Sequence, residues 1–563
     1  MDSPFAPSVR PRRAPAPTAD WDENLADSLP EDERKEFGES VLELVEQDRD
    51  AREPWERLAA KGLKLMGIIP PDAETGGDVS PPIDTEGKAP DWWQSKVIHP
   101  LLGEAITRYQ ARASAEINPP EGPAKGAVVA EDATEDLEKQ ATRVAHELND
   151  IYTRRSPEMM DQTDRMLWYQ AAEGTVYTKN VWDKLRGVRR SLIRMQDMWV
   201  PSHVDVFDEA PRHTHRMYWS PGRVRRMMRE GYLREIDLER LAGVAPDRSD
   251  ADDLADAAVG LDRDANQDLG NKRDLPFEIY ETYIDWRFEG RGMPPFEVRY
   301  VSTIEPTSGE VLALRRCWKQ NNPENQPWRL ITPYYFILGG HPGPYGLGLY
   351  HLVGGLSETA TILLRSIADT ASHHASPSGF IERAILNTEG YDTTPVKPGE
   401  FRGVPLPVDD LRKAIMALPL GDIAPMFTIL EFVVGAGQRF ASTPDLMTGN
   451  SDPRAPVGTT LAMIERGSEI PTSIHSRTHR SQTRELQLQA ELIGTNIDPA
   501  ATYLWPVEKG QNNLVANDFD GRVDVEPVAD SRVASQSHRL AQAEGILHLS
   551  TQAPQLYDLK EAH

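Results

Sequence analysis

The fold is decided by residues 345–465, a stretch that opens with Tyr345-Gly-Leu-Gly-Leu-Tyr-His-Leu-Val-Gly-Gly-Leu356. Apolar residues recur at helical intervals from here, and proline does not fit the interior of a helix, so a long helix is expected to end at Pro377. A second helix is expected over 422–440. The segment between the helices is rich in proline and glycine and too poor in apolar residues to fold alone. It is therefore expected to complete its core against other copies.

The region after the second helix is expected to hold a loop and one more long helix. Residues 443–457 combine proline, glycine and asparagine, a composition typical of a loop. Helical periodicity then continues from about Thr459 to Leu492, where Pro471 predicts a kink.

The first half of the chain mixes helices and strands. Extended, apolar or alternating runs predict strands at 175–182, 195–207, 277–288, 296–304, 310–318 and 331–338. Helical spacing predicts helices within 31–65, with a break at Pro54, and around 98–109 and 134–151. A basic helical stretch at 222–241 leads into an exposed acidic insertion near 247–268. The predicted fold class is therefore α+β.

Composition limits the function classes. A chain of 563 residues exceeds what one core usually organises, so several lobes are expected. The net charge of −26 disfavours an ordinary DNA-binding protein, because Lys and Arg contacts to phosphates drive such binding. The single cysteine, Cys317, fits assembly in a reducing cytoplasm. The sequence shows neither a secretory signal nor an apolar run of roughly 18 residues, so no membrane insertion is expected.

Motifs for catalysis or cofactor binding are weak. The glycine-rich stretch 339–348 lacks the lysine and the acidic residue of nucleotide-binding loops, so it is expected to form a tight turn into a helix. His213 with His215, and His373 with His374, lack the spacing and the carboxylate partner of a zinc site and are expected to be surface or interface residues. We therefore expect no cofactor, no metal and no enzymatic activity.

Basic and aromatic residues mix in two stretches, 182–194 and 218–229. Such stretches could contact DNA or an acidic partner. A solvated face that offsets acidic neighbours in the same oligomer is the preferred interpretation.

Together with the opening motif, several strings in a fixed order resemble signatures of tailed-bacteriophage portal proteins, particularly those of short-tailed phages. The order and spacing are more specific than any one string, and the resemblance covers roughly residues 92–556. The further strings are Pro100-Leu-Leu-Gly-Glu-Ala-Ile106, Asp164-Arg-Met-Leu167, Gly174-Thr-Val-Tyr-Thr-Lys-Asn-Val-Trp182, Lys397-Pro-Gly-Glu-Phe-Arg402, Gly437-Gln-Arg-Phe-Ala-Ser442 and Ala455-Pro-Val-Gly-Thr-Thr-Leu-Ala-Met-Ile-Glu465.

This resemblance implies a portal fold. A flexible N-terminal arm (1–30) would precede a mixed α/β wing (31–349), followed by two stem helices (350–376 and 421–442) that flank a small clip (377–420). A tunnel loop (443–457) would lead into a long helix and a return to the wing (458–530). Proteins of this kind commonly continue into a helical crown, so 531–563 is expected to begin a crown that is short or truncated.

The resemblance also implies a function. Portal subunits form rings, typically of twelve, at the portal vertex of the virion, through which double-stranded DNA is packaged and ejected. The implied partners are the terminase, the head-to-tail adaptor, and the major capsid protein or scaffold. The candidate tunnel residues are Arg439, Arg454, Asn450 and Thr448, where a salt bridge to a neighbouring subunit is the alternative role for the two arginines. The candidate clip residues for docking are Phe380, Ile381, Tyr391, Phe401 and Arg402.

Two other classes stay open at this point. A minor capsid or connector protein would also be a virion structural protein, but connectors are usually much shorter and lack two long helices around a clip. A DNA-packaging nuclease or ATPase would need a Walker-type lysine or a cluster of metal-binding carboxylates, and the sequence offers neither.

Overall fold

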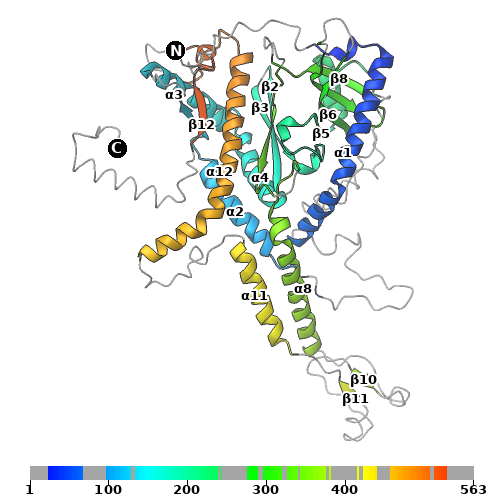
Figure 1. The fold of residues 1–563 in the computed structure, drawn as a ribbon, viewed down its shortest axis with the longest axis vertical. Coiled ribbons are helices and arrows are strands. Elements are labelled where there is room, and N and C mark those ends of the chain that lie inside the picture. The colour runs from blue at the N-terminus through cyan, green and yellow to red at the C-terminus, as the bar shows by residue number, and fades with distance from the viewer. Residues whose placement is uncertain are drawn as a thin grey trace, which may run out of the picture.

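The computed structural model describes residues 23–66, 95, 97–128, 134–184, 186–238, 241, 276–288, 294, 296–319, 326–339, 343–375, 379–381, 415–417, 422–440, 457–506 and 513–528. Helices and strands mix within these residues, so the chain is α+β, as predicted. A broad body holds the two larger sheets, and a pair of helices extends away from it (Figure 1). No helix among the described residues is long and apolar enough to cross a membrane.

A five-stranded antiparallel sheet forms one half of the body, with the strand order β4-β5-β6-β7-β8. Helix α1 (Glu31–Leu65) packs on this sheet and buries Phe37, Val41 and Val45 among its apolar residues. The strands are β4 (Met198–Trp199), β5 (Arg212–Trp219), β6 (Phe277–Trp286), β7 (Val298–Glu305) and β8 (Glu310–Arg316).

A three-stranded antiparallel sheet, with the order β3-β2-β9, forms the centre of the body. The first six residues of its middle strand are all buried, because helices and the other sheet cover both faces. Its strands are β2 (Thr175–Asp183), β3 (Gly187–Arg194) and β9 (Ile331–Tyr335), and the helices α2 (Leu101–Ile117) and α4 (Glu158–Glu173) lie beside it.

A smaller unit joins distant parts of the chain. Strand β1 (Ala124–Ala127) pairs antiparallel with β12 (Asp524–Pro527), and α3 (Glu135–Asp150) and the short α13 (Val515–Asp518) contribute to the same core. Residues Leu486 and Leu492 of α12 (Val457–Asn496) are buried in that core as well.

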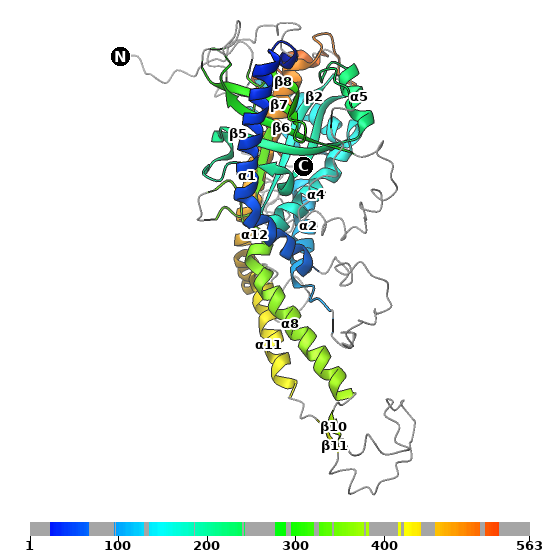
Figure 2. The same ribbon diagram turned by 90° about the vertical axis from the view of Figure 1, so that its right-hand side faces the viewer.

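Three long helices follow the order predicted from the sequence. Helices α8 (Leu349–Ala375) and α11 (Ala424–Phe440) lie side by side and extend away from the body in both views (Figures 1 and 2). The strands β10 (Gly379–Ile381) and β11 (Ile415–Ala417) pair antiparallel at the far end of these helices. Helix α12 then returns along the body, and it bends (Figure 1), as expected of a helix that contains Pro471.

Two local predictions are wrong in the region that the side chain of Arg52 contacts. Pro54 does not end α1, and residues 195–207 form a strand only at Met198–Trp199. The buried guanidinium of Arg52 donates hydrogen bonds to the carbonyl oxygens of Met195, Gln196 and Met198. These bonds hold α1 on the body on the N-terminal side of Pro54. The short strand β4 nevertheless forms beside them, where Met198 and Trp199 pair with His215 and Thr214 of β5.

The predicted basic helix at 222–241 is shorter than expected. Helix α5 covers only Pro221–Arg229, and Gly231 follows it with a φ of +69°. A left-handed residue of this kind commonly ends a helix, and glycine adopts it without a steric penalty.

The interpretation of His213 and His215 as surface or interface residues is wrong. Both lie on β5 and are only 6% and 9% exposed. The ring of His213 stacks on Tyr283 of β6, with ring centroids 4.7 Å apart. Burial lowers the pKa of His215 to about 4, so both histidines belong to the core in their neutral form. His374 lies exposed on α8.

The predicted N-terminal arm extends less far than residue 30. Leu25 and Ala26 are buried beside β8, and the side chain of Asn24 donates to the carbonyl oxygen of Leu312 and accepts from the backbone N–H of Leu314. Other predicted features lie outside the described residues. They are the start of the arm, the acidic insertion at 247–268, most of the clip, the tunnel loop and residues 531–563.

Candidate functional site

The start of α8 is fixed to the body by close contacts between glycines. Gly174 follows α4 with a φ of +94°, and its carbonyl oxygen accepts a hydrogen bond of 2.9 Å from Phe336 N–H. A Cβ on Gly348 would lie 2.4 Å from the carbonyl oxygen of Ala172, and one on Gly346 would lie 2.6 Å from that of Gly174. Only glycine allows backbones to approach this closely.

The amide groups of this glycine turn are bonded within the protein. The N–H of Gly346 donates to the hydroxyl of Thr175 at 2.7 Å, and the N–H of Gly348 donates to Nδ1 of His351 at 3.1 Å. A phosphate cradle needs such N–H groups free to face its ligand. The turn therefore acts as a joint at the base of α8, as the sequence predicted.

The first turns of α8 are buried by α1 and α2. Tyr350 is only 3% exposed, and a Cβ on Gly62 of α1 would lie 2.4 Å from its ring. Lys61, which directly precedes Gly62, lies 2.8 Å from Glu358 of α8 in an ion pair at the surface. The base of α8 is thus wedged against α1.

An extended segment around residues 95–99 lies beside the middle of α8. The backbone N–H of Ser95 donates to Asp369 Oδ1 at 2.5 Å, and that of His99 donates to the hydroxyl of Thr361 at 3.1 Å. In the opposite direction, Arg365 Nε donates to the carbonyl oxygen of Val97 at 2.9 Å. These three bonds tie α8 to the chain just before α2.

Helix α11 is held mainly by α8 and, near its C-terminal end, by α2, where Val434 packs in the same core as Leu101. Near its C-terminal end, a Cβ on Gly437 would lie 2.6 Å from Leu101 Cδ2 of α2. Val433, one turn earlier, is 8% exposed. Most of the remaining helix has side chains open to solvent.

Large apolar side chains are exposed on this helix pair. Phe427, Ile429 and Phe432 of α11 are 51%, 51% and 69% exposed, and Ile362 of α8 is 57% exposed. We call these four residues the apolar stem surface. The only charged residues of α11 are Glu431 and Arg439. They lie on more than one side of α11, because Phe427 and Ile429 are about 160° apart around the helix. Exposed apolar groups of this size are typical of residues that contact another molecule.

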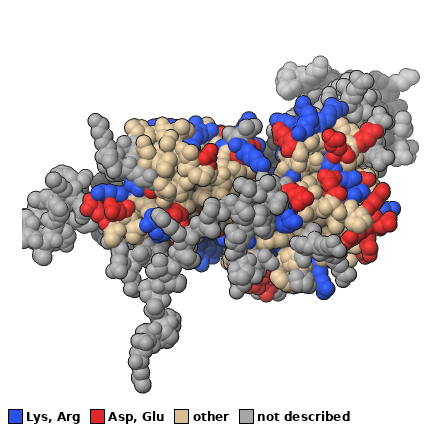
Figure 3. All heavy atoms as spheres, turned by 90° about the horizontal axis from the view of Figure 1, so that it is seen from above, with Lys and Arg blue, Asp and Glu red and all other residues tan. Residues whose placement is uncertain are grey.

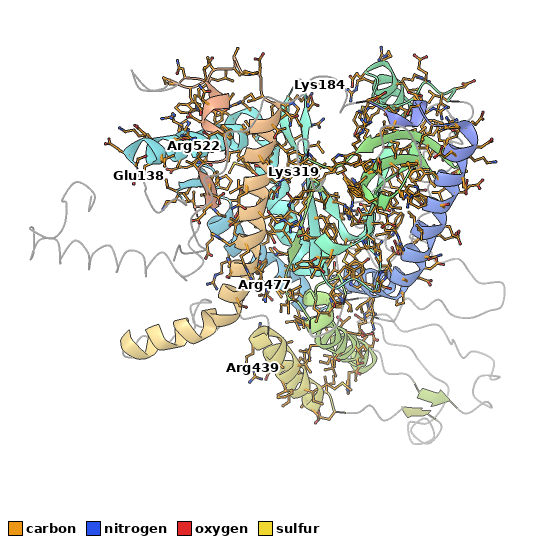
Figure 4. The ribbon with its side chains drawn as sticks, turned by 45° about the horizontal axis from the view of Figure 1, so that its top comes forward. Glu138, Lys184, Lys319, Arg439, Arg477 and Arg522 are labelled. Atoms are coloured by element: carbon orange, nitrogen blue, oxygen red, sulfur yellow. The ribbon has the colours of Figure 1, made fainter. Side chains whose placement is uncertain are left out.

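The predicted site residues occupy opposite ends of the helix pair. Arg439 lies at the end of α11 near the body (Figure 4), is exposed, and donates through Nε to the carbonyl oxygen of Gly435 at 3.1 Å. It forms no ion pair within the described part of the chain. Phe380 and Ile381 lie on β10, where they pair with Met416 and Ile415. The remaining candidates lie outside the described residues, namely Arg454, Asn450, Thr448, Tyr391, Phe401 and Arg402.

A row of buried polar residues on α12 was not predicted from the sequence. The residues recur at intervals of three and four, and each is below 9% exposed, so they form one face of the helix. They are His475, Thr478, Gln482, Glu485 and Gln489. We call this face the polar seam.

Each residue of the polar seam is bonded to the body. His475 Nδ1 lies 2.9 Å from Glu116 Oε2 of α2, and Gln482 donates to the carbonyl oxygen of Ile117 at 3.2 Å. The hydroxyl of Thr478 accepts a hydrogen bond of 2.8 Å from Gln170 of α4. The seam therefore fixes the position of α12 along the helices it covers.

Glu485 is the most fully bonded member of the seam. Its carboxylate accepts hydrogen bonds from Arg190 of β3 at 2.7 Å, from Asn180 of β2 at 2.9 Å, and from the hydroxyl of Tyr334 of β9. Burial alone would raise its pKa, but Arg190 and these bonds hold the pKa of Glu485 below its usual value. One carboxylate thereby joins α12 to all three strands of the central sheet.

A second buried ion pair joins the two sheets. Lys179 Nζ of β2 lies 2.5 and 2.6 Å from the carboxylate oxygens of Glu281 of β6, which also accepts a bond of 2.6 Å from Tyr283. Glu173, at the end of α4, forms no such ion pair among the described residues, and the nearby charges of Arg194 and Arg52 only partly offset its burial. It is 1% exposed, and burial raises its pKa to about 7.

The described residues contain no group of His, Cys, Asp or Glu side chains that could hold a metal ion. Cys317 is buried and forms no disulfide, and burial raises its pKa to about 12.

Comparison with known proteins gives a distant structural likeness. No protein-family model and no curated protein match the sequence. Among solved structures, the chain is similar to one described as "Neck of empty GTA particle computed with C6 symmetry", at 10% sequence identity. The match covers 87% of this chain and 96% of that chain, with a TM-score of 0.36. A likeness at this TM-score assigns no function to the chain.

Proposed function

We propose that this chain is a portal-type subunit, one copy in a ring that conducts double-stranded DNA into and out of a viral capsid. The observation that carries the proposal is the helix pair α8 and α11, which leaves an α+β body and ends in the paired strands β10 and β11. In such a ring the helix pair is the stem and the segment beyond it is the clip, where the terminase and later the head-to-tail adaptor would dock.

The apolar stem surface supports assembly into a ring. Phe432 is 69% exposed on a helix that faces little else in its own subunit, and burial against neighbouring stems would remove this apolar area from water. Closed rings of identical subunits need two complementary faces on each copy. The stem surface supplies the apolar part of such an interface.

The charge of the chain supports a channel through which DNA slides. Each cation that neutralises a phosphate adds to salt-dependent holding, and a net charge of −26 keeps such contacts few. Arg439, exposed at the body end of the stem, is the described residue we propose for transient phosphate contact.

We also propose a structural rather than an enzymatic role. The strongly bonded polar groups, such as Arg190 with Glu485, are almost completely buried and bonded to one another. Groups that act on a substrate must reach it, so these groups serve to hold the fold. Robust ATP hydrolysis by the pure chain would contradict this part of the proposal.

The test is electron microscopy of the purified full-length chain. We expect rings with a central hole wide enough for duplex DNA, and rotational symmetry that can be counted in end views. A chain that stays monomeric at high concentration, with no rings on the grid, would overturn the proposal.

A further inference from the structure

Helix α5 presents a strongly basic surface at the top of the body. The helix, labelled in Figure 2, packs against the five-stranded sheet through Val224, which is buried with Trp219 and Phe277. Lysines and arginines gather in groups on the surface of the molecule seen from above (Figure 3). Four arginines of α5 are exposed, and we call them the α5 arginines. They are Arg223, Arg225, Arg226 and Arg229.

The α5 arginines have few counter-charges within the described residues. Arg226 lies 3.9 Å from Glu230, in a pair whose side chains are 60% and 54% exposed. Arg225 and Arg229 form no ion pair in the described part of the chain. Spaced three and four residues apart, like charges destabilise a helix, so an anionic partner would stabilise this one.

The surroundings of α5 add to this positive potential. Arg223 stacks over the ring of Trp219, with its Cζ 4.7 Å from the ring centroid. Partial burial and then the charges of Arg189 and Arg226 lower the pKa of Arg223. Arg189, on β3, is 52% exposed and lies 3.7 Å from Asp183, so its charge is only partly offset where it adds to the positive potential at Arg223.

An acidic segment of the same chain is attached at both ends beside α5. Residues 247–268 contain eight aspartates and two arginines. The described chain stops at Leu241 before this segment and resumes just before Phe277. Leu241 and Phe277 are buried in one apolar cluster with Val224 of α5 and Trp219, which pairs with Phe277 in register.

Length and charge therefore match the segment to the basic surface. The 35 residues between Leu241 and Phe277 can span at most about 3.3–3.6 Å each, which is enough to reach along α5. Tethering also raises the effective concentration of the segment near α5 far above that of a free partner.

We propose that α5 is a docking surface for the acidic segment 247–268 of its own chain. The guanidinium groups of the α5 arginines bind aspartate carboxylates of the segment, which masks a basic surface on an otherwise acidic protein. The proposal does not depend on the channel function. Docking gives a role to the opposite charges of α5 and of the segment 247–268, which are close together in the sequence.

The test measures the distance between α5 and the segment with two spin labels. Gly222→Cys offers a site on α5 where a Cβ meets nothing within 4 Å, and Ala257→Cys lies within the segment. Cys317 stays unlabelled, because it is buried and its thiol has a pKa of about 12. Pulsed dipolar spectroscopy of the full-length chain should give a short-distance component at low salt.

High salt, or removal of the charges on α5, should abolish that short-distance component. At 1 M salt the screening length falls to about 3 Å, so the component should be lost. The Arg225→Gln/Arg229→Gln variant should lose it too. The matched control, Arg108→Gln/Arg112→Gln, removes two arginines at the same spacing from α2 and should keep it. A distance distribution that is the same at low and high salt, and the same in the original chain and the α5 variant, would overturn the proposal.

Two further experiments show whether the segment that docks on α5 belongs to the same chain. Asp252→Asn/Asp253→Asn/Asp256→Asn leaves α5 unchanged and should cause the same loss, so a misfolded α5 cannot account for the result. Dilution with unlabelled chain before assembly should leave the component intact, whereas its disappearance would show docking onto a neighbouring copy and overturn the proposal. A short DNA duplex should bind the Asp→Asn variant more tightly than the original chain. Equal binding would also contradict masking by the segment.

Discussion

Arg190 of β3 and Glu485 of α12 form an ion pair across 2.7 Å, with side chains that are only 2% and 1% exposed. The residues are far apart in the sequence, and their contact joins the last long helix to the central sheet.

Glu485→Gln should strongly destabilise the chain. The substitution removes the carboxylate but leaves the Arg190 guanidinium buried without its counter-charge. Removal of one partner of a buried pair typically costs about 3–5 kcal/mol. We expect a clear fall in the thermal unfolding midpoint and faster hydrogen exchange in the C-terminal half of α12.

Glu491→Gln, on the same helix, is the matched control. Glu491 pairs with Lys319 at 2.7 Å, but both side chains are partly exposed, at 32% and 26%, so the change should cost at most about 1 kcal/mol. Equal losses in the two variants would show that the buried pair holds α12 no more firmly than a surface pair does.

Gly348→Ala should disturb the joint at the base of α8. The new methyl group would lie 2.4 Å from the Ala172 carbonyl oxygen and 2.5 Å from the Gly174 backbone nitrogen, so backbone must move. Forced overpacking of this kind costs about 1–3 kcal/mol or more. A lower melting temperature, with increased exchange at the start of α8, is the expected measurement.

Gly355→Ala, two turns further along α8, is expected to change the stability in the opposite direction. A Cβ there meets nothing within 4 Å, so alanine should stabilise the helix by roughly 0.5–1 kcal/mol. A destabilised Gly355→Ala variant would mean that α8 also needs flexibility at this position. It would contradict the view that the glycines at 346 and 348 alone form the joint.

Local patterns were sufficient to predict the order of the long helices. The run from Leu349 has helical periodicity and ends before a proline, and the helix ends at Ala375. The strand predicted at 175–182, from its β-branched and aromatic residues, is confirmed as β2. Such signals depend on neighbouring residues alone, so one sequence contains them.

Buried charges could not be predicted because their partners are distant in the sequence. In the sequence, Arg190 is one of several arginines in a stretch expected to form a solvated face, and its partner Glu485 lies 295 residues later. His213 and His215 likewise looked like surface residues, because only the pairing of β5 with β6 places them against Tyr283 and Glu281. A polar residue in a short window of sequence gives no sign of whether tertiary structure satisfies its hydrogen bonds.

The stability of the chain should fall with rising pH because of Glu173. Burial raises its pKa from the ordinary 4.5 to about 7, so the folded state binds the proton more tightly than the unfolded state does. Its contribution is fully present below pH 4.5 and is lost as the pH rises through about 7. Two and a half pKa units correspond to roughly 3 kcal/mol.

Glu173→Gln should remove this pH dependence and stabilise the chain at pH 8 relative to the original. Unfolding midpoints measured from pH 5 to pH 8 would show it as a flatter curve. Glu138→Gln, at an exposed position on α3, is the control and should leave the curve unchanged. Parallel curves for the Glu173→Gln variant and the original chain would contradict the assignment.

Phe432→Ser should weaken assembly without destabilising the subunit. The side chain is 69% exposed in the isolated chain, so its loss should change the stability of the monomer by less than about 0.5 kcal/mol. If neighbouring stems bury it, removal of an aromatic anchor should cost about 2 kcal/mol or more at each interface, roughly a thirtyfold loss in affinity. Mass photometry over a range of concentrations would show rings replaced by smaller species. Val206→Ser, at an exposed apolar position on the body, should assemble normally. If both variants form rings as the original chain does, the apolar stem surface is not the interface that closes the ring.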